Sequence, residues 1–152
     1  MEGDYYQFQI LASKLNLPEQ NIPDTITVCN LSNVEEYNKI LDLFFTIFPD
    51  EIDSEKGRDL RDMQITESEG TFLAKLGQEI IGFLVTGIIN QVGYISYIGV
   101  LEEFRSRGIA TALLKRFKEY LQAENVEKIR CKIRKDNQKT LGYIYYLGFK
   151  KL

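Results

Sequence analysis

Residues 94–121 constrain the fold of this chain most, because an apolar strand leads through a glycine turn straight into an amphipathic helix. Residues 94–100 are largely apolar, and residues 112–121 repeat apolar side chains at helical spacing. The turn is therefore a helix N-terminus, whose backbone N–H groups lack partners and carry a partial positive charge. Gly108 and Ala110 keep side chains small there, while Arg105 and Arg107 add full charges. The combination predicts a turn that binds phosphate.

This turn resembles the acetyl-CoA signature of the GNAT superfamily of acetyltransferases, which reads Arg or Gln, two residues, Gly, one residue, then Gly or Ala. Arg105, Gly108 and Ala110 fill these positions. The pattern is short, and a surface helix that begins at a glycine and carries solvated arginines has it as well. The interpretation therefore depends on a second feature of the chain.

Asn137 provides that second feature. A helical segment follows it and ends at Leu147-Gly148-Phe149, which resembles the second family motif, an asparagine eleven residues ahead of the glycine in a Leu-Gly-Phe helix terminus. Two motifs in the family's order argue against a chance match. The resemblance extends over residues 25–152 and is strongest over residues 94–149.

The resemblance implies an α/β fold of the GNAT type, with helices flanking a mixed, mostly antiparallel twisted sheet whose two central parallel strands splay apart. Residues 1–152 are interpreted as one domain, with a helical extension over residues 1–24. Periodicity and turn residues predict strands over residues 25–29, 71–76, 79–89, 94–100 and 126–134 and from residue 149, and helices over residues 4–15, 32–48, 55–65, 112–121 and 138–147.

Two helices are predicted from apolar stripes and capping residues. The first begins at Asp4, stops before Pro18 and has the stripe Tyr5, Phe8, Leu11 and Leu15. A capping box of Ser32 and Glu35 predicts the start of the second. The expected buried face of the second helix is Val34, Tyr37, Leu41, Phe44 and Phe48.

One edge of the sheet is expected to need a cover. Family members usually continue through a final strand, whereas here Leu152 follows closely on the Gly-Phe corner, so that strand is expected to be short or absent. Proteins commonly cover an open edge with another segment or subunit. We therefore expect a homodimer, with residues 4–15 as a second candidate for the cover.

Composition limits the chemistry. The 152 residues contain no apolar run of 18 that could span a membrane, and residues 1–9 do not resemble a secretory signal, so a cytoplasmic location is expected. Cys29 and Cys131 lack metal-type spacing and the chain has no histidine, so no metal site is expected. Acid–base work must fall to carboxylates, tyrosines, amines or water.

Charge divides between the two halves of the chain. Residues 1–70 hold 5 Lys/Arg against 15 Asp/Glu, a charge of −10, while residues 71–152 hold 14 against 7, a charge of +7. The basic half suits a phosphorylated ligand, and the acidic half suits a cationic acceptor such as a polyamine, a lysine or an amino sugar. Nucleic acid is disfavoured as a partner, because the basic residues of 128–134 alternate along the strand and so form a single face that is simply exposed to solvent.

The resemblance implies that acetyl-CoA binds as co-substrate and that an amine of a small molecule or peptide attacks it directly. The backbone of Ile98, Gly99 and Val100 would pair with the pantetheine arm and offer an N–H to the developing oxyanion. Asn137 would bind the same arm, and it could also cap the following helix. The expected pyrophosphate-binding residues are Arg105, Ser106, Arg107, Gly108, Ile109, Ala110 and Thr111.

Two family groups for proton transfer are missing. Many relatives carry a glutamate on the signature strand or on the strand before Asn137. Here the first strand offers Tyr94, Ser96 and Tyr97, and the second has Lys132 at that position. Tyr97, a water chain or an acid from residues 50–55 could accept the amine's proton instead. The family's tyrosine position, four residues before the glycine of Leu-Gly-Phe, is Ile144. Tyr145 lies about 80° from Asn137 on a helical wheel and is the nearest substitute.

The rival interpretation is a catalytically weak acyl-CoA-binding or regulatory module, supported by these missing groups. A coenzyme A thiol can leave unassisted, so loss of the tyrosine would slow turnover without preventing it.

Overall fold

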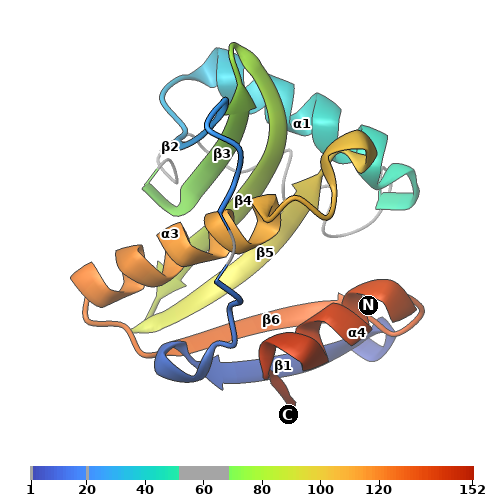
Figure 1. Ribbon diagram of the computed structural model, residues 1–152. Helices are drawn as coiled ribbons and strands as arrows, with labels where there is room; N and C mark the ends of the chain where they lie inside the picture. Colours follow the sequence, from blue (N-terminus) through green and yellow to red (C-terminus); the bar gives the residue numbers. More distant parts are fainter. Residues whose placement is uncertain (1, 20, 52–68) are drawn as a thin grey trace.

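The computed structural model describes residues 2–19, 21–51 and 69–152. In this part of the chain a seven-stranded sheet forms the centre of the molecule (Figure 1). Helices α3 (Ile109–Ala123) and α4 (Gln138–Leu147) pack on one face of the sheet, and α1 (Val34–Ile47) packs on the other. The expected helix over residues 55–65 lies outside the described residues. Of the described helices, none is long and apolar enough to cross a membrane.

The strand order β2-β3-β4-β5-β6-β1-β7 confirms the expected fold class. Neighbouring strands are antiparallel except for the central pair β5–β6, which is parallel. The strands are β1 (Tyr5–Leu11), β2 (Ile26–Asn30), β3 (Thr71–Leu76), β4 (Glu79–Ile89), β5 (Val92–Val100), β6 (Lys128–Arg134) and β7 (Lys150–Lys151).

The N-terminal segment is a strand, and the prediction of a helix over residues 4–15 was wrong. Short 3-10 helices at Glu2–Asp4 and Ala12–Lys14 flank β1, which pairs antiparallel with β6 from Tyr5↔Arg134 to Leu11↔Lys128. Phe8 and Ile10 turn inward and are buried. The candidate segment thus covers the edge of β6, although as a strand. The open edge that suggested a homodimer is therefore filled from within the chain.

Helix α1 begins one residue later than the capping box predicted. Asn33 is the N-cap and accepts a hydrogen bond from Glu36 N–H at 2.9 Å, while the Glu36 carboxylate accepts from the backbone N–H and the hydroxyl of Ser32. The buried face also differs, because Val34 is 60% exposed, whereas Tyr37 and Phe44 are buried as expected. Ile40 and Leu43 complete that face.

The second half of the chain follows the prediction closely. The hairpin β3–β4, the turn at Asn90 and Gln91, the strand β5 and the helices α3 and α4 all lie where expected. Gly148 ends α4 at φ +102°, and its N–H and that of Phe149 donate back to carbonyls of the last turn. The last strand, β7, has only the two residues Lys150–Lys151.

Candidate active site

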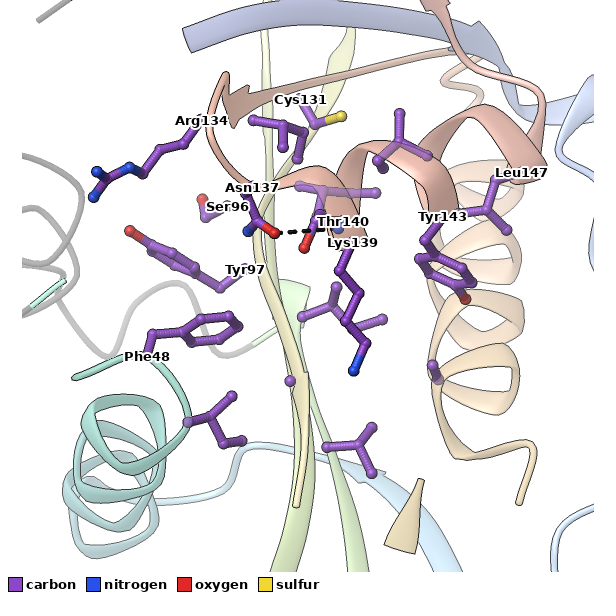
Figure 2. Close-up of a pocket in the computed structure, with 18 of the residues that line it drawn as sticks. Phe48, Ser96, Tyr97, Cys131, Arg134, Asn137, Lys139, Thr140, Tyr143 and Leu147 are labelled. Carbon is purple, nitrogen blue, oxygen red and sulfur yellow. Dashed lines mark hydrogen bonds between the residues drawn. The ribbon is translucent and has the colours of Figure 1, made fainter. Parts of the chain in front are cut away.

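The central parallel strands part beyond their first four paired residues. The β5–β6 ladder runs from Val92↔Lys128 to Ile95↔Cys131, and beyond it the two strands no longer pair with each other, although β5 stays paired with β4 and β6 with β1. A cavity of about 600 Å³ lies at this splay, between α3, α4 and the end of α1 (Figure 2). Its lining comes from β5, β6, α3 and α4 and from the segments that follow α1, β5 and β6, and it includes Phe48, Asp50, Ile95, Ser96, Tyr97, Ile98, Gly99, Val100, Arg105, Ala110, Cys131, Arg134, Asp136, Asn137, Lys139, Thr140, Tyr143 and Ile144.

The splay leaves backbone groups of β5 facing the cavity. Successive residues of a strand direct their N–H and C=O groups to opposite edges. Leu101 N–H donates to Ile81 O of β4, whereas Val100 O accepts from the Arg105 side chain, so the groups of Ile98 and Val100 turn away from β4 toward the splay. An extended ligand there could pair with β5 as an added strand does.

Packing on the α1 side of the sheet explains why position 99 has no side chain. A Cβ at this position would lie 3.0 Å from the Phe83 ring and 3.1 Å from Ile47 Cδ1, so the missing side chain makes room for core residues on the α1 side of the sheet. Phe83 is also its cross-strand partner. Gly99 therefore lets β4, β5 and α1 pack closely beside the cavity.

The turn before α3 has an unusual backbone. Ser106 (φ +64°) and Gly108 (φ +82°) are left-handed, and Gly108 is the N-cap of α3. The Arg105 Nε donates to Val100 O at 2.9 Å, and the Arg107 guanidinium lies over the Phe104 ring at 5.4 Å. Both arginines thus help to hold the turn in place.

The structure brings the predicted cofactor residues together in two groups. Side chains or backbone of the first group line the cavity: Ile98, Gly99, Val100, Arg105, Ala110 and Asn137. The second group forms the adjoining turn without lining the cavity: Ser106, Arg107, Gly108, Ile109 and Thr111. Ile109 and Thr111 are buried, at 2% and 7% exposure.

Asn137 is the N-cap of α4. Its Oδ1 accepts a hydrogen bond from Thr140 N–H at 3.2 Å. The amide nitrogen Nδ2 makes no hydrogen bond to the described residues, and Figure 2 shows it directed into the cavity toward Ser96 and Tyr97. The capping bond therefore fixes the side chain so that a donor faces the cavity, which is compatible with both roles considered from the sequence.

Aromatic and charged groups share the end of the cavity near α1. Tyr97 is 9% exposed, and its ring packs against Phe44 at 4.3 Å and Phe48 at 6.1 Å. Asp50 lines the same end. Arg134 forms a two-pronged pair with Asp136, at 3.2 and 3.1 Å.

The tyrosines of α4 are not placed as the helical wheel suggested. Tyr145 is outside the cavity lining, 53% exposed, and its ring lies edge-on to Phe8 at 5.4 Å. Ile144, at the family's tyrosine position, does line the cavity, and so does Tyr143. Burial, with a smaller contribution from Tyr146, raises the pKa of Tyr143 to about 12. Its hydroxyl points away from Asn137, alongside α3 (Figure 2).

The basic residues of β6 make contacts within the sheet. Arg130 Nε donates to Gln9 Oε1 at 2.8 Å, and Lys132 lies over the Tyr5 ring at 5.1 Å. Lys132 does not line the cavity. The strand β1, missed from the sequence, thus provides partners for this face.

The model of the acetyltransferase (GNAT) family matches residues 37–149. The chain belongs to the GNAT family. The match covers most of helix α1, the splayed strands and both motif helices, and it confirms the resemblance drawn from Arg105, Gly108, Ala110 and Asn137.

Solved structures share this GNAT fold. A GCN5-related N-acetyltransferase from Sphaerobacter thermophilus has a TM-score of 0.74 at 16% identity, over 97% of this chain and 48% of that one. PH1933 from Pyrococcus horikoshii OT3 has a TM-score of 0.67 at 25% identity, over 84% and 90% of the two chains. AAC(6')-Iy, solved with the bisubstrate analog CoA-S-monomethyl-acetylneamine, has a TM-score of 0.63 at 20% identity, over 82% and 90%.

The chain spans about half the length of the first of these structures, and 57% of a further similar protein from Staphylococcus epidermidis ATCC 12228. GNAT membership and fold thus apply to this chain, while activity, acceptor and partners are matters for proposal.

Proposed function

We propose that this protein is an N-acetyltransferase that transfers the acetyl group of acetyl-CoA directly to a primary amine of a small molecule or peptide. The observation that carries the proposal is the cavity at the β5–β6 splay, which joins unpaired β5 backbone to the start of α3. The GNAT membership of residues 37–149 supports it.

The residues of the splay fit coenzyme A. The N–H and C=O groups of Ile98 and the N–H of Val100, whose carbonyl accepts from Arg105, would pair with the pantetheine arm, and the Asn137 amide would donate to it. The left-handed residues Ser106 and Gly108 shape the turn before α3, and Ala110 of the first helical turn lines the cavity, so the N–H groups and dipole of this helix start would favour the diphosphate. A β5 N–H would also stabilise the negative charge that develops on the thioester oxygen.

The amine acceptor would enter from the end lined by Phe48, Asp50 and Tyr97. An ordinary alkyl amine has a pKa near 10.4, so about one molecule in a thousand is uncharged at neutral pH, and a group must accept its proton. We assign this step to Tyr97, which would orient the amine and pass the proton to water. Asp50 is the alternative acceptor. A cationic acceptor remains part of the proposal, since Asp50 adds negative charge at this end.

The leaving thiolate would depart without a tyrosine acid. Ile144 offers no proton, Tyr145 lies outside the cavity, and Tyr143 turns its hydroxyl toward α3. A thiol of ordinary pKa, about 8.5, leaves as a thiolate at neutral pH without great cost. The work of this site is therefore positioning and charge stabilisation.

Calorimetry followed by a thiol-release assay tests the proposal. The wild-type protein should bind acetyl-CoA and then release coenzyme A with at least one amine from a panel of polyamines, aminoglycosides, amino acids and peptides. Absence of acetyl-CoA binding would refute the proposed function outright.

A second function, acyl-CoA binding without turnover, is favoured by one observation: the pocket holds Ile144 where relatives carry tyrosine. Binding of acetyl-CoA with no thiol release on any amine would support this regulatory module over the enzyme.

A further inference from the structure

We propose that Lys139 of α4 binds the diphosphate of coenzyme A from the wall opposite α3, so that the phosphates are held between a helix start and a lysine. This inference rests on the proposed function and concerns a residue that neither sequence motif contains.

Among the described residues that line the cavity, Lys139 is the cation with neither a hydrogen-bond nor an ion-pair partner. Three basic residues of the described chain line the cavity: Arg105, Arg134 and Lys139. Arg105 donates to Val100 O, and Arg134 is held by Asp136. Within the described residues, Lys139 makes no hydrogen bond or ion pair. Its charge is therefore available to an anion.

The position of Lys139 in α4 is electrostatically unfavourable without an anion. Asn137 is the N-cap, so Lys139 is the second residue of the helix, and the first turn contains no acidic residue. A cation at the positive end of a helix is destabilising. An anion in the cavity would reverse this effect, because it would meet both the lysine and the helix end.

The direction of the side chain fits this role. Lys139 and Tyr143 are one helical turn apart on α4, and both line the cavity. Figure 2 shows Lys139 extending from α4 into the space between β5 and α3, away from Asn137. The cavity also contains Val100, Arg105 and Ala110 of the opposite wall. The first turn of α3 contains no acidic residue either.

Tyr143 adds an uncharged donor beside this lysine. A tyrosine hydroxyl is protonated at neutral pH, and burial raises the pKa of Tyr143 further, to about 12, so the side chain can donate a hydrogen bond without adding negative charge near the phosphates. The face of α4 formed by Lys139 and Tyr143 is thus chemically suited to a phosphorylated arm.

Calorimetry with two ligands tests the inference: acetyl-CoA, and S-acetylpantetheine, which has no phosphate. Lys139→Gln should weaken acetyl-CoA binding about tenfold or more, the usual size of a lost hydrogen bond to a charged group, and leave S-acetylpantetheine unchanged. Lys139→Arg should restore most of the affinity. Lys150→Gln, which removes the same charge from the exposed strand β7, is the matched control and should change neither affinity.

The outcomes separate the two proposals. If the wild type binds acetyl-CoA and Lys139→Gln binds it equally well, the lysine assignment is wrong while the proposed function stands. Equal losses for both ligands would also overturn the assignment, because they would indicate a structural role. A change confined to the KM of the amine would place Lys139 at the acceptor instead. A wild type that binds neither ligand would remove both proposals.

Discussion

Tyr97 and Tyr145 illustrate how the chemistry of this site depends on the direction of single side chains. Tyr97 lines the cavity at the end near α1, whereas Tyr145 packs on Phe8 outside it. We expect Tyr97→Phe to lower kcat by at least about tenfold with little change in the Kd of acetyl-CoA, because a group in the path of the amine's proton is removed. Steady-state kinetics and calorimetry measure the two effects. Tyr145→Phe is the matched control and should leave both values unchanged; a larger loss there than at Tyr97 would reverse the assignment.

Ser106 stores backbone strain in the turn before α3. A residue with a side chain at φ +64° is uncommon, and a β-branched residue there is a true outlier. Ser106→Val should therefore destabilise the protein by about 1–2 kcal/mol and weaken acetyl-CoA binding. Ser106→Gly, the control, accepts this conformation without strain and should be at least as stable as wild type. Urea unfolding measures the stability, and calorimetry measures the affinity for acetyl-CoA. A Ser106→Val variant with unchanged stability and affinity would show that the turn tolerates a β-branched residue.

The turn itself could be predicted from residues, while the placement of the α4 tyrosines could not. Gly108 and Asn137 stand in short motifs whose spacing is local. A helical wheel that counts 100° per residue from Asn137 points to Tyr145. Asn137 is the N-cap, however, and its φ of −90° and ψ of 74° are not helical. The reference direction was therefore wrong. The spacing of Lys139 and Tyr143 is visible in the sequence, but only the fold shows that this face meets the cavity.

At the scale of elements, β1 shows where local patterns mislead. Tyr5, Phe8 and Leu11 recur at helical spacing, yet Tyr6, Phe8 and Ile10 alternate with Gln7 and Gln9 as a strand does. The partner β6 decides between the two patterns, and it lies more than a hundred residues along the chain. Hairpin strands such as β3 and β4 were predictable because their partners adjoin them and the Gly77-Gln78 turn marks the register.

The burial of β1 gives a direct test of its role as a sheet strand. Phe8 is fully buried in the main core, whereas Leu11 of the same strand is 41% exposed. Phe8→Ala should destabilise the protein by about 3–5 kcal/mol, since it removes a large side chain and leaves a cavity. Leu11→Ala should cost less than about 1 kcal/mol. Urea unfolding measures both, and equal effects would argue against this placement of β1.

A partly buried ion pair between Glu36 and Lys75 joins α1 to β3. Burial alone would raise the pKa of Glu36, but the hydrogen bonds from Lys75 and Ser32 outweigh it and lower the pKa from 4.5 to about 2. The folded state thus holds its proton less tightly than the unfolded chain. The stabilisation is fully present above pH 4.5 and is lost as the pH falls toward 2.

Glu36→Gln should remove this pH dependence. We expect it to lose on the order of 1–2 kcal/mol of unfolding free energy at pH 7 and to differ much less from wild type near pH 2. Unfolding curves at both pH values check this. Glu35→Gln, on the exposed side of the same turn, is the control; a loss for Glu36→Gln that does not depend on pH would contradict the ionic explanation.

At the scale of the whole molecule, the cavity lies where two cores meet. One core lies under α3 and α4 and includes β1 and β6, and the other lies under α1 and includes Phe83 and Tyr97. The strand β5 contributes to both, since a Cβ at Gly93 would meet Leu121 of α3 while one at Gly99 would meet Ile47 of α1. A ligand at the splay would therefore contact elements of both cores at once.

This arrangement predicts how coenzyme A changes the stability of the protein. A ligand that binds the folded state at one hundred times its Kd stabilises it by about 2.7 kcal/mol. For a chain of this length that corresponds to a rise in Tm of roughly 5–10 °C. Because the splay joins both cores, the whole molecule should unfold in one transition at the higher temperature. Calorimetry with and without coenzyme A measures this. Two separate transitions, with only one shifted by the ligand, would show that the ligand contacts one core alone. Lys139→Gln at the same ligand concentration should reduce the rise in Tm by about half, because a tenfold weaker Kd removes about 1.4 kcal/mol of the stabilisation.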